Sequence, residues 1–152
     1  MLDDLTVFSF GQAITFSAAS NYPGTGGGSF AAGVLDTGGS DAISEAVTKF
    51  PLVISVGVPF QGPVGSTILA YLQESNDGVN WLTSDLSDVN ANTLTQLQQP
   101  GYILLKGPIP IVGIGVVPGQ VTGKLGRYLR CYYQVSGGPF TAGTLNAWLD
   151  TY

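Results

Sequence analysis

Alternation of apolar and polar residues predicts β-strands along most of this chain, and two runs carry the pattern most clearly. In residues 50–58, one face at period two is formed by Leu52, Ile54, Val56 and Val58. In residues 67–74, the positions Ile68, Ala70 and Leu72 alternate with Leu69 and Tyr71. Because both faces of this second run are largely apolar, it predicts an interior strand of a sandwich.

A second pair of β-type segments, residues 127–135 and 141–149, flanks a Gly-Gly-Pro turn. Together with Phe140, the two segments carry Tyr, Val, Thr and Phe, which suit a pleated, half-buried surface. Alternation in the first segment predicts a core face of Leu129, Cys131, Tyr133 and Val135, and an outer face of Tyr128, Arg130, Tyr132 and Gln134. Cys131 is expected to behave as a small apolar core residue.

The rest of the chain predicts short strands, turns and little helix. Strands are expected at residues 5–10, 13–17, 30–35, 79–82, 102–106 and 109–117. Gly11-Gln12 is expected to separate the first two, and a tight turn at 75–78 to precede the strand at 79–82. Loops are expected at residues 21–29 and 83–99, and one helical turn at residues 42–48.

This pattern predicts an all-β fold, an antiparallel β-sandwich or jelly roll, with less than about a tenth of the residues in helix. No repeat or change of composition divides residues 1–152, so we expect a single domain. The apolar faces of the runs at 50–58, 67–74 and 127–135 are expected to meet in one core.

Composition points to a surface that meets other proteins. Charged residues make up 10% of the chain, against about 25% in an ordinary soluble domain, while 44% of the residues are hydrophobic and Gly numbers 22. Neutral, apolar surface usually contacts another copy or a partner, so we expect a symmetric homo-oligomer, a homo-dimer or homo-trimer. A net charge of −5 with only five basic residues argues against nucleic acid as a partner.

The chain has no histidine and one cysteine, Cys131, which excludes several classes of active site. His-based acid–base catalysis, Ser-His-Asp and Cys-His nucleophiles and ordinary zinc sites all need residues that are missing. The acidic start of the chain does not resemble a signal peptide, and the apolar region 103–117 is interrupted by Lys106 and two prolines. We therefore expect a protein that is made and used without export, binds no membrane and is not an enzyme.

Three further patterns in the sequence are candidates for a chemical site. The Gly-rich run 24–29 lacks the Gly-Lys-Ser/Thr ending of a phosphate-binding loop, so it predicts a flexible connection. Glu74 with Asp77, and Asp85 with Asp88, are candidate carboxylate pairs for acid–base work or calcium. Asp77 is better explained as a turn residue and the other pair as part of a polar loop, so no metal or cofactor is expected.

The segment from Ser75 to Trp81 resembles the Ser-x-Asp-Gly-x-x-Trp hairpin of discoidin-like sugar-binding modules, and more loosely the Asp-box of sialidase propellers. The favoured interpretation is structural: Asp77 and Gly78 form the turn, and Trp81 packs beneath it. The alternative is a carbohydrate-binding jelly-roll module built around Asp77 and Trp81. Exposure of Trp81 would favour this alternative, and its burial would argue against it.

The basic residues Lys124, Arg127 and Arg130 lie close together at one strand entrance. Solvated charge is one interpretation of this cluster. However, Arg130 lies between Tyr128 and Tyr132 on the predicted outer face, and Arg and Tyr are enriched at interface hot spots. Tyr128, Arg130 and Tyr132 are therefore candidate interface residues.

Several segments together resemble the capsid cement (decoration) proteins of tailed bacteriophages. The segments are the start of the chain through Phe8-Ser9-Phe10-Gly11-Gln12-Ala13, the strand and turn at 67–78, and the Lys/Arg-Arg-Tyr-Leu-Arg-x-x-Tyr pattern within 124–133. The resemblance implies a non-enzymatic jelly-roll protein on the outer surface of the virion capsid. Such a protein staples neighbouring capsomers as an oligomer on a symmetry axis, with the major capsid protein as its partner, and is made in the host cytoplasm. A tail or baseplate component is a further alternative.

The N-terminal residues 1–29 suggest a separate hypothesis. Leu5, Val7, Phe8 and Phe10 are strongly apolar and are followed by a Gly-rich stretch. An apolar β segment next to a flexible hinge is typical of an arm that adds to a neighbouring chain. We expect residues 1–20 to contact an adjacent protomer or the shell; the alternative is that residues 5–10 form the first strand of their own sandwich.

Overall fold

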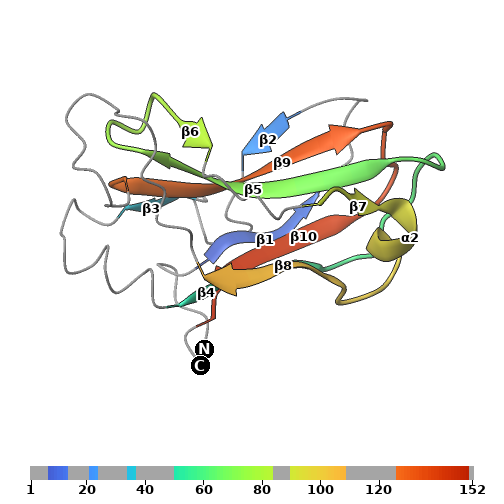
Figure 1. Cartoon of the computed structure of the whole chain (residues 1–152). Coiled ribbons are helices and arrows are strands. Elements are labelled where there is room, and N and C mark those ends of the chain that lie inside the picture. Colours follow the sequence, from blue (N-terminus) through green and yellow to red (C-terminus); the bar gives the residue numbers. More distant parts are fainter. Residues whose placement is uncertain are drawn as a thin grey trace.

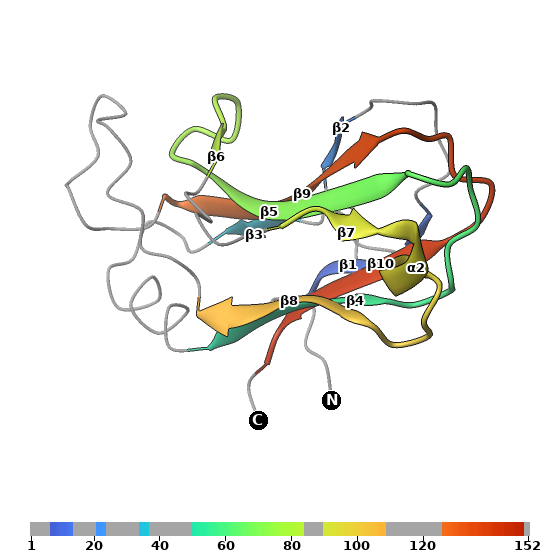
Figure 2. The same cartoon turned by 45° about the vertical axis from the view of Figure 1, so that its right-hand side comes forward.

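The fold consists of two antiparallel β-sheets packed face to face, as seen in a computed structural model (Figures 1 and 2). The structure describes residues 7–13, 21–23, 34–36, 50–83, 90–108 and 126–150. The expected all-β class and sandwich architecture are confirmed.

The first sheet has the strand order β1-β10-β4-β8. Its strands are β1 (Val7–Ala13), β10 (Thr144–Leu149), β4 (Pro51–Val56) and β8 (Ile103–Pro108). Every neighbouring pair is antiparallel. Because β1 pairs with β10, the first and last described strands of the chain lie side by side.

The second sheet is built on the long central pair β5 (Thr67–Ser75) and β9 (Tyr128–Ser136). The two strands pair along their whole length, from Thr67 opposite Ser136 to Ser75 opposite Tyr128. Short strands border this pair: β2 (Asn21–Pro23) and β3 (Val34–Asp36) beside β9, and β6 (Leu82–Thr83) and β7 (Asn92–Thr93) beside β5.

The strand pairs are nested along the chain. β1 pairs with β10, β2 and β3 with β9, β4 with β8, and β5 with β6 and β7. These pairs describe one long antiparallel ribbon whose two halves run in opposite directions. The further pairs β10·β4 and β9·β5 join alternate parts of the ribbon into the two sheets, the first part with the third and the second with the fourth.

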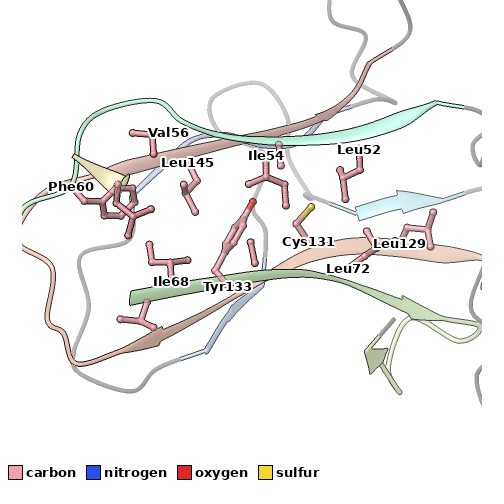
Figure 3. Close-up of a cluster of buried hydrophobic side chains, with 14 of the residues drawn as sticks. Leu52, Ile54, Val56, Phe60, Ile68, Leu72, Leu129, Cys131, Tyr133 and Leu145 are labelled. Carbon is pink, nitrogen blue, oxygen red and sulfur yellow. The ribbon is translucent and has the colours of Figure 1, made fainter. Parts of the chain in front are cut away.

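The core lies between the two sheets (Figure 3). Leu52, Ile54 and Val56 point from β4 toward the second sheet, where they face Ile68, Leu72 and the inward residues of β9. The expected core faces therefore meet in one cluster. Val58 is the exception: β4 ends at Val56, and the Val58 side chain is 52% exposed.

The N-terminal region differs from the sequence expectation in two places. β1 continues through Gly11-Gln12, which was expected to interrupt it, and register shifts at Val7/Ser9 and Ser9/Gln12 absorb the irregularity. Asn21–Pro23 was expected to belong to a loop but pairs with β9 as strand β2. In both places, pairing with a long neighbouring strand outweighs the local turn preference.

The middle region differs as well. Residues 83–99 were expected to form a long loop, but they contain β7 and the helix α2 (Leu94–Leu97), and the Leu97 side chain is fully buried in the core. The Gln96 side chain fixes the start of this helix, because Oε1 accepts a hydrogen bond from the Thr93 N–H at 2.9 Å. The strand expected at 79–82 begins only at Leu82, because the preceding turn is longer than expected.

Several expectations lie outside the described residues. They are Leu5, the strands at 13–17 (beyond Ala13) and 109–117, most of the strand at 30–35, the Gly-rich run 24–29, the helical turn at 42–48, the pair Asp85 and Asp88, and Lys124.

Candidate functional site

The outer face of β9 carries the expected alternation. The core-facing side chains Leu129, Cys131, Tyr133 and Val135 are fully buried, whereas Tyr128, Arg130 and Tyr132 on the opposite face are half-buried. Burial raises the pKa of the Cys131 thiol, which agrees with its expected role as an apolar core residue.

Arg130 lies at the centre of a group of side chains on this outer face. Its guanidinium carbon is 4.0 Å from the centroid of the Trp81 ring and 5.4 Å from that of Tyr132. Its Nε–H donates a hydrogen bond to Oε1 of Gln73, directly opposite on β5, at 2.8 Å. These contacts hold the plane and the direction of the guanidinium.

Tyr71 completes the group. It lies opposite Tyr132 in the β5–β9 register, and the two ring centroids are 5.4 Å apart at an interplanar angle of 36°. We define the aromatic–arginine cluster as Tyr71, Gln73, Trp81, Arg130 and Tyr132. Tyr71 and Gln73 come from β5, Arg130 and Tyr132 from β9, and Trp81 directly precedes β6. Pairing of β5 with β9 and with β6 brings these side chains together.

Partial burial changes the electrostatics of the cluster. Desolvation lowers the pKa of Arg130 and raises the pKa of Tyr71, because burial disfavours the charged form of each group. Within the described part of the chain, Arg130 makes no ion pair. The cluster therefore presents one half-buried positive charge surrounded by aromatic rings.

Tyr128 and Arg127 form a separate arrangement at the start of β9. The Arg127 guanidinium makes a bidentate ion pair with Asp36, at 2.9 and 3.0 Å, and lies 4.8 Å from the Tyr128 ring centroid. The pair with Asp36 raises the pKa of Arg127. Thus the structure brings Arg130 and Tyr132 together but places Tyr128 with Arg127 instead.

Within the turn at Ser75–Asn80, the Asp77 carboxylate accepts hydrogen bonds from neighbouring residues of the same turn. The donors are the Asn80 and Val79 N–H groups at 2.7 and 2.8 Å, the Asn80 side-chain amide and the Ser75 hydroxyl. These bonds, that from the Asn80 backbone first, hold the pKa of Asp77 far below its usual range. Asp77 is therefore a turn-forming residue, as expected.

Trp81 does not lie fully buried beneath this turn. Its side chain is half-buried, and one face of the ring stacks on Arg130. This arrangement ties the turn to the aromatic–arginine cluster.

Glu74 has a different environment from Asp77. Its side chain is buried, and Oε2 accepts a hydrogen bond from the Gly126 N–H at 2.9 Å. The two carboxylates of this candidate pair therefore bind different backbone groups: Glu74 binds the Gly126 N–H, and Asp77 binds N–H groups of its own turn. Among the described residues there is no group of three His, Cys, Asp or Glu that could hold a metal ion.

The apolar N-terminal residues Val7, Phe8 and Phe10 lie in β1, which pairs with β10 of the same chain. This is the arrangement of the alternative, in which the segment is the first strand of its own sandwich. A contact of residues 1–20 with a neighbouring protomer or a shell stays a prediction.

Sequence reasoning identified Arg130 and Tyr132 but missed their neighbours on β5. Tyr71 and Gln73 carry a usable signal, since they occupy alternate positions in a strand whose other face is the apolar set Ile68, Ala70 and Leu72. Only the β5–β9 register shows that these alternate positions lie opposite Tyr132 and Arg130.

Comparison with known proteins identifies no family: no family model matches this chain, and no curated protein is significantly similar to it. In the part of the chain that the structure describes, no helix is long and apolar enough to cross a membrane.

Proposed function

We propose that this chain is a capsid cement protein of jelly-roll type that binds the outside of a tailed-phage capsid and bridges neighbouring capsomers. The nested strand pairing supports the jelly-roll assignment. A long antiparallel ribbon wrapped around a core gives two sheets whose outermost pairs come from the two ends of the chain. The resemblance of the sequence segments supports the assignment to cement proteins.

The observation that carries the proposal is the aromatic–arginine cluster on the outer face of the second sheet. Tyr, Trp and Arg contribute most to protein–protein hot spots, and here they are held in fixed orientations by stacking and by the hydrogen bond to Gln73. A side-chain arrangement that is rigid before binding loses less conformational entropy on association. We propose that this face contacts the major capsid protein.

The mechanism of stabilisation is mechanical. Packaged DNA presses on a shell whose weak points are the seams between capsomers. A bound protein that spans a seam adds binding free energy that must be lost before the seam opens, and an oligomer adds it at several points. We propose a homo-dimer or homo-trimer for this reason, with the N-terminal residues 1–20 as a further contact.

Co-sedimentation tests the proposal. The purified protein is expected to sediment with mature shells and not with isolated capsid subunits. Tyr132→Ala is expected to weaken shell binding by about tenfold or more, as loss of a hot-spot aromatic does. Gln98→Ala, an exposed change near α2, is the matched control and should bind as the wild type does. Equal binding of Tyr132→Ala and wild type would rule out this face.

A second candidate function is a carbohydrate-binding module on a virion appendage. The observation in its favour is that Trp81 is only half-buried, since an accessible indole can stack on a sugar ring. The engagement of Asp77 by its own turn and the stacking of Arg130 on Trp81 argue against it. Shifts of the Trp81 indole resonance on addition of host-surface oligosaccharide would favour this candidate over the cement protein.

A further inference from the structure

Arg130 is held in place, while most of its hydrogen-bond donors have no partner among the residues that the structure describes. A guanidinium has five N–H donors in a planar fork. One of them, on Nε, is bound to Gln73, and one ring face of Trp81 covers the plane. Within the described part of the chain, the Nη groups at the end of the fork donate no hydrogen bond to another side chain or to the backbone.

Arg127, three residues earlier in the chain, provides a comparison, because its guanidinium is paired with a carboxylate. It forms a bidentate pair with Asp36 although both side chains are exposed. The chain has ten acidic residues and only five basic ones. Although acidic residues are more numerous, Arg130, which is more buried than Arg127, has no carboxylate partner among the described residues.

We infer that the aromatic–arginine cluster is a receptor for a single carboxylate side chain of a partner protein, which pairs with the Nη groups of Arg130. A bidentate arginine–carboxylate pair provides two charge-assisted hydrogen bonds. The fork is already oriented by Trp81 and Gln73, so little conformational entropy is lost when the pair forms. As the capsid contact, this inference rests on the proposed function, and the partner residue is then an Asp or Glu of the shell.

The charge of the site favours a carboxylate over a phosphate. On the described outer face of β5 and β9, Arg130 is the basic residue that lacks an acidic partner, and Arg127 is neutralised by Asp36. One positive charge matches one carboxylate, whereas phosphate and nucleic-acid sites gather several basic groups or backbone N–H groups.

An NMR titration without shells tests the receptor directly. The probe is a tetraglutamate peptide added to the full chain, and the readouts are the ¹H–¹⁵N resonances of the Arg130 Nε–H and the Trp81 indole N–H. We expect saturable shifts of both resonances with tetraglutamate and none with tetraglutamine. Arg130→Gln is expected to abolish the Trp81 shift, and Arg130→Lys to weaken binding by about tenfold or more, because a lysine cannot form the fork.

Arg127→Gln is the matched control, since it removes a guanidinium outside the cluster, and it should leave the titration unchanged. Shifts that persist in Arg130→Gln, or that inorganic phosphate produces equally well, would overturn the carboxylate receptor. Absence of any shift with tetraglutamate would overturn it as well.

Co-sedimentation with mature shells then separates this inference from the proposed function. If wild type binds shells and Arg130→Gln binds equally well, the receptor is not the shell contact although the cement function stands. If wild type does not bind shells, the cement function fails, and the titration still decides whether Arg130 receives a carboxylate. A change in the oligomeric state of Arg130→Gln by sedimentation would assign the carboxylate to a second copy and overturn the shell as partner.

Discussion

The two ends of the sandwich are held together by different forces. At one end, the connections at residues 57–66, 94–103 and 136–144 contain no Asp, Glu, Lys or Arg. At the other end lie Asp36, Glu74, Asp77 and Arg127. Figure 2 shows α2 and its neighbouring connections at the first end, and the turn after β5 with the start of β9 at the second.

The uncharged end is stabilised by apolar burial and by backbone hydrogen bonds. Phe60 and Phe140 are buried and pack edge to face, with ring centroids 5.0 Å apart. The Phe60 N–H donates to the Leu97 carbonyl at 3.0 Å, and Gln61 exchanges backbone hydrogen bonds with Thr141 and Ala142. None of these contacts depends on an ionised group.

The charged end is stabilised by side chains that bind backbone groups or each other. Glu74 accepts from the Gly126 N–H, Asp77 closes its own turn, and Arg127 pairs with Asp36. Such contacts weaken when a carboxylate is protonated or when salt screens it. The comparison therefore teaches that one end should respond to pH and salt, while the other should respond mainly to changes in packing.

The largest expected effect is at the base of the uncharged end. Gly143 has φ +135°, and a Cβ there would overlap with the ring of Phe60. Gly143→Ala combines overpacking with backbone strain, so we expect the free energy of unfolding to fall by about 2–6 kcal/mol. Urea denaturation measures it. Gly107→Ala is the control, since no atom lies within 4 Å of its added Cβ, and an equal loss there would show that the Phe60 contact is not the cause.

Leu72→Ala tests the core that joins both ends. Leu72 is fully buried between the sheets, so the cavity left by its removal should cost about 2–5 kcal/mol. Leu69→Ala in the same strand is the matched control, because Leu69 is half-buried on the opposite face and should lose less. A loss of less than about half a kcal/mol for Leu72→Ala would contradict its place in the core.

The charged end should show a pH dependence that Asp77→Asn removes in part. The folded pKa of Asp77 is lowered, chiefly by the hydrogen bond from the Asn80 N–H. Its contribution is therefore complete well above the unfolded pKa of about 3.9 and declines as the pH falls below it. Urea midpoints measured between about pH 6 and pH 3 should fall more steeply for wild type than for Asp77→Asn. Parallel slopes would show that the turn bonds do not stabilise the ionised form.

The smallest effect is expected at the tip of the uncharged end. The Val64 side chain is 99% exposed, so Val64→Ser removes no buried contact. The free energy of unfolding should change by at most about half a kcal/mol at any pH. A larger loss, measured by the same urea titration, would mean that the stability of this end depends on its surface as well as on Phe60 and Phe140.

Local pattern was sufficient to predict much of the fold. Period-two alternation predicted the strands β4, β5 and β9 and the two faces of β9, because side-chain direction in a strand follows directly from residue order. The residue types beside the Gly-Gly-Pro turn predicted β10, and together these strands predicted the all-β sandwich. The same alternation placed Arg130 and Tyr132 on an outer face. The turn at Asp77 was also predictable, since Asx side chains bind nearby backbone N–H groups within a few residues.

Tertiary pairing decided the rest. β2 and β7 are two- to three-residue strands that exist because β9 and β5 offer long edges to pair with, and Leu97 is buried because the sandwich has an open end that α2 covers. The aromatic–arginine cluster has the same origin. Gln73 and Arg130 are 57 residues apart in the chain, and only the β5–β9 register brings them within hydrogen-bonding distance. Sequence alternation assigns a residue to a face, but its neighbour across the sheet depends on register, which long-range packing of the two apolar faces determines.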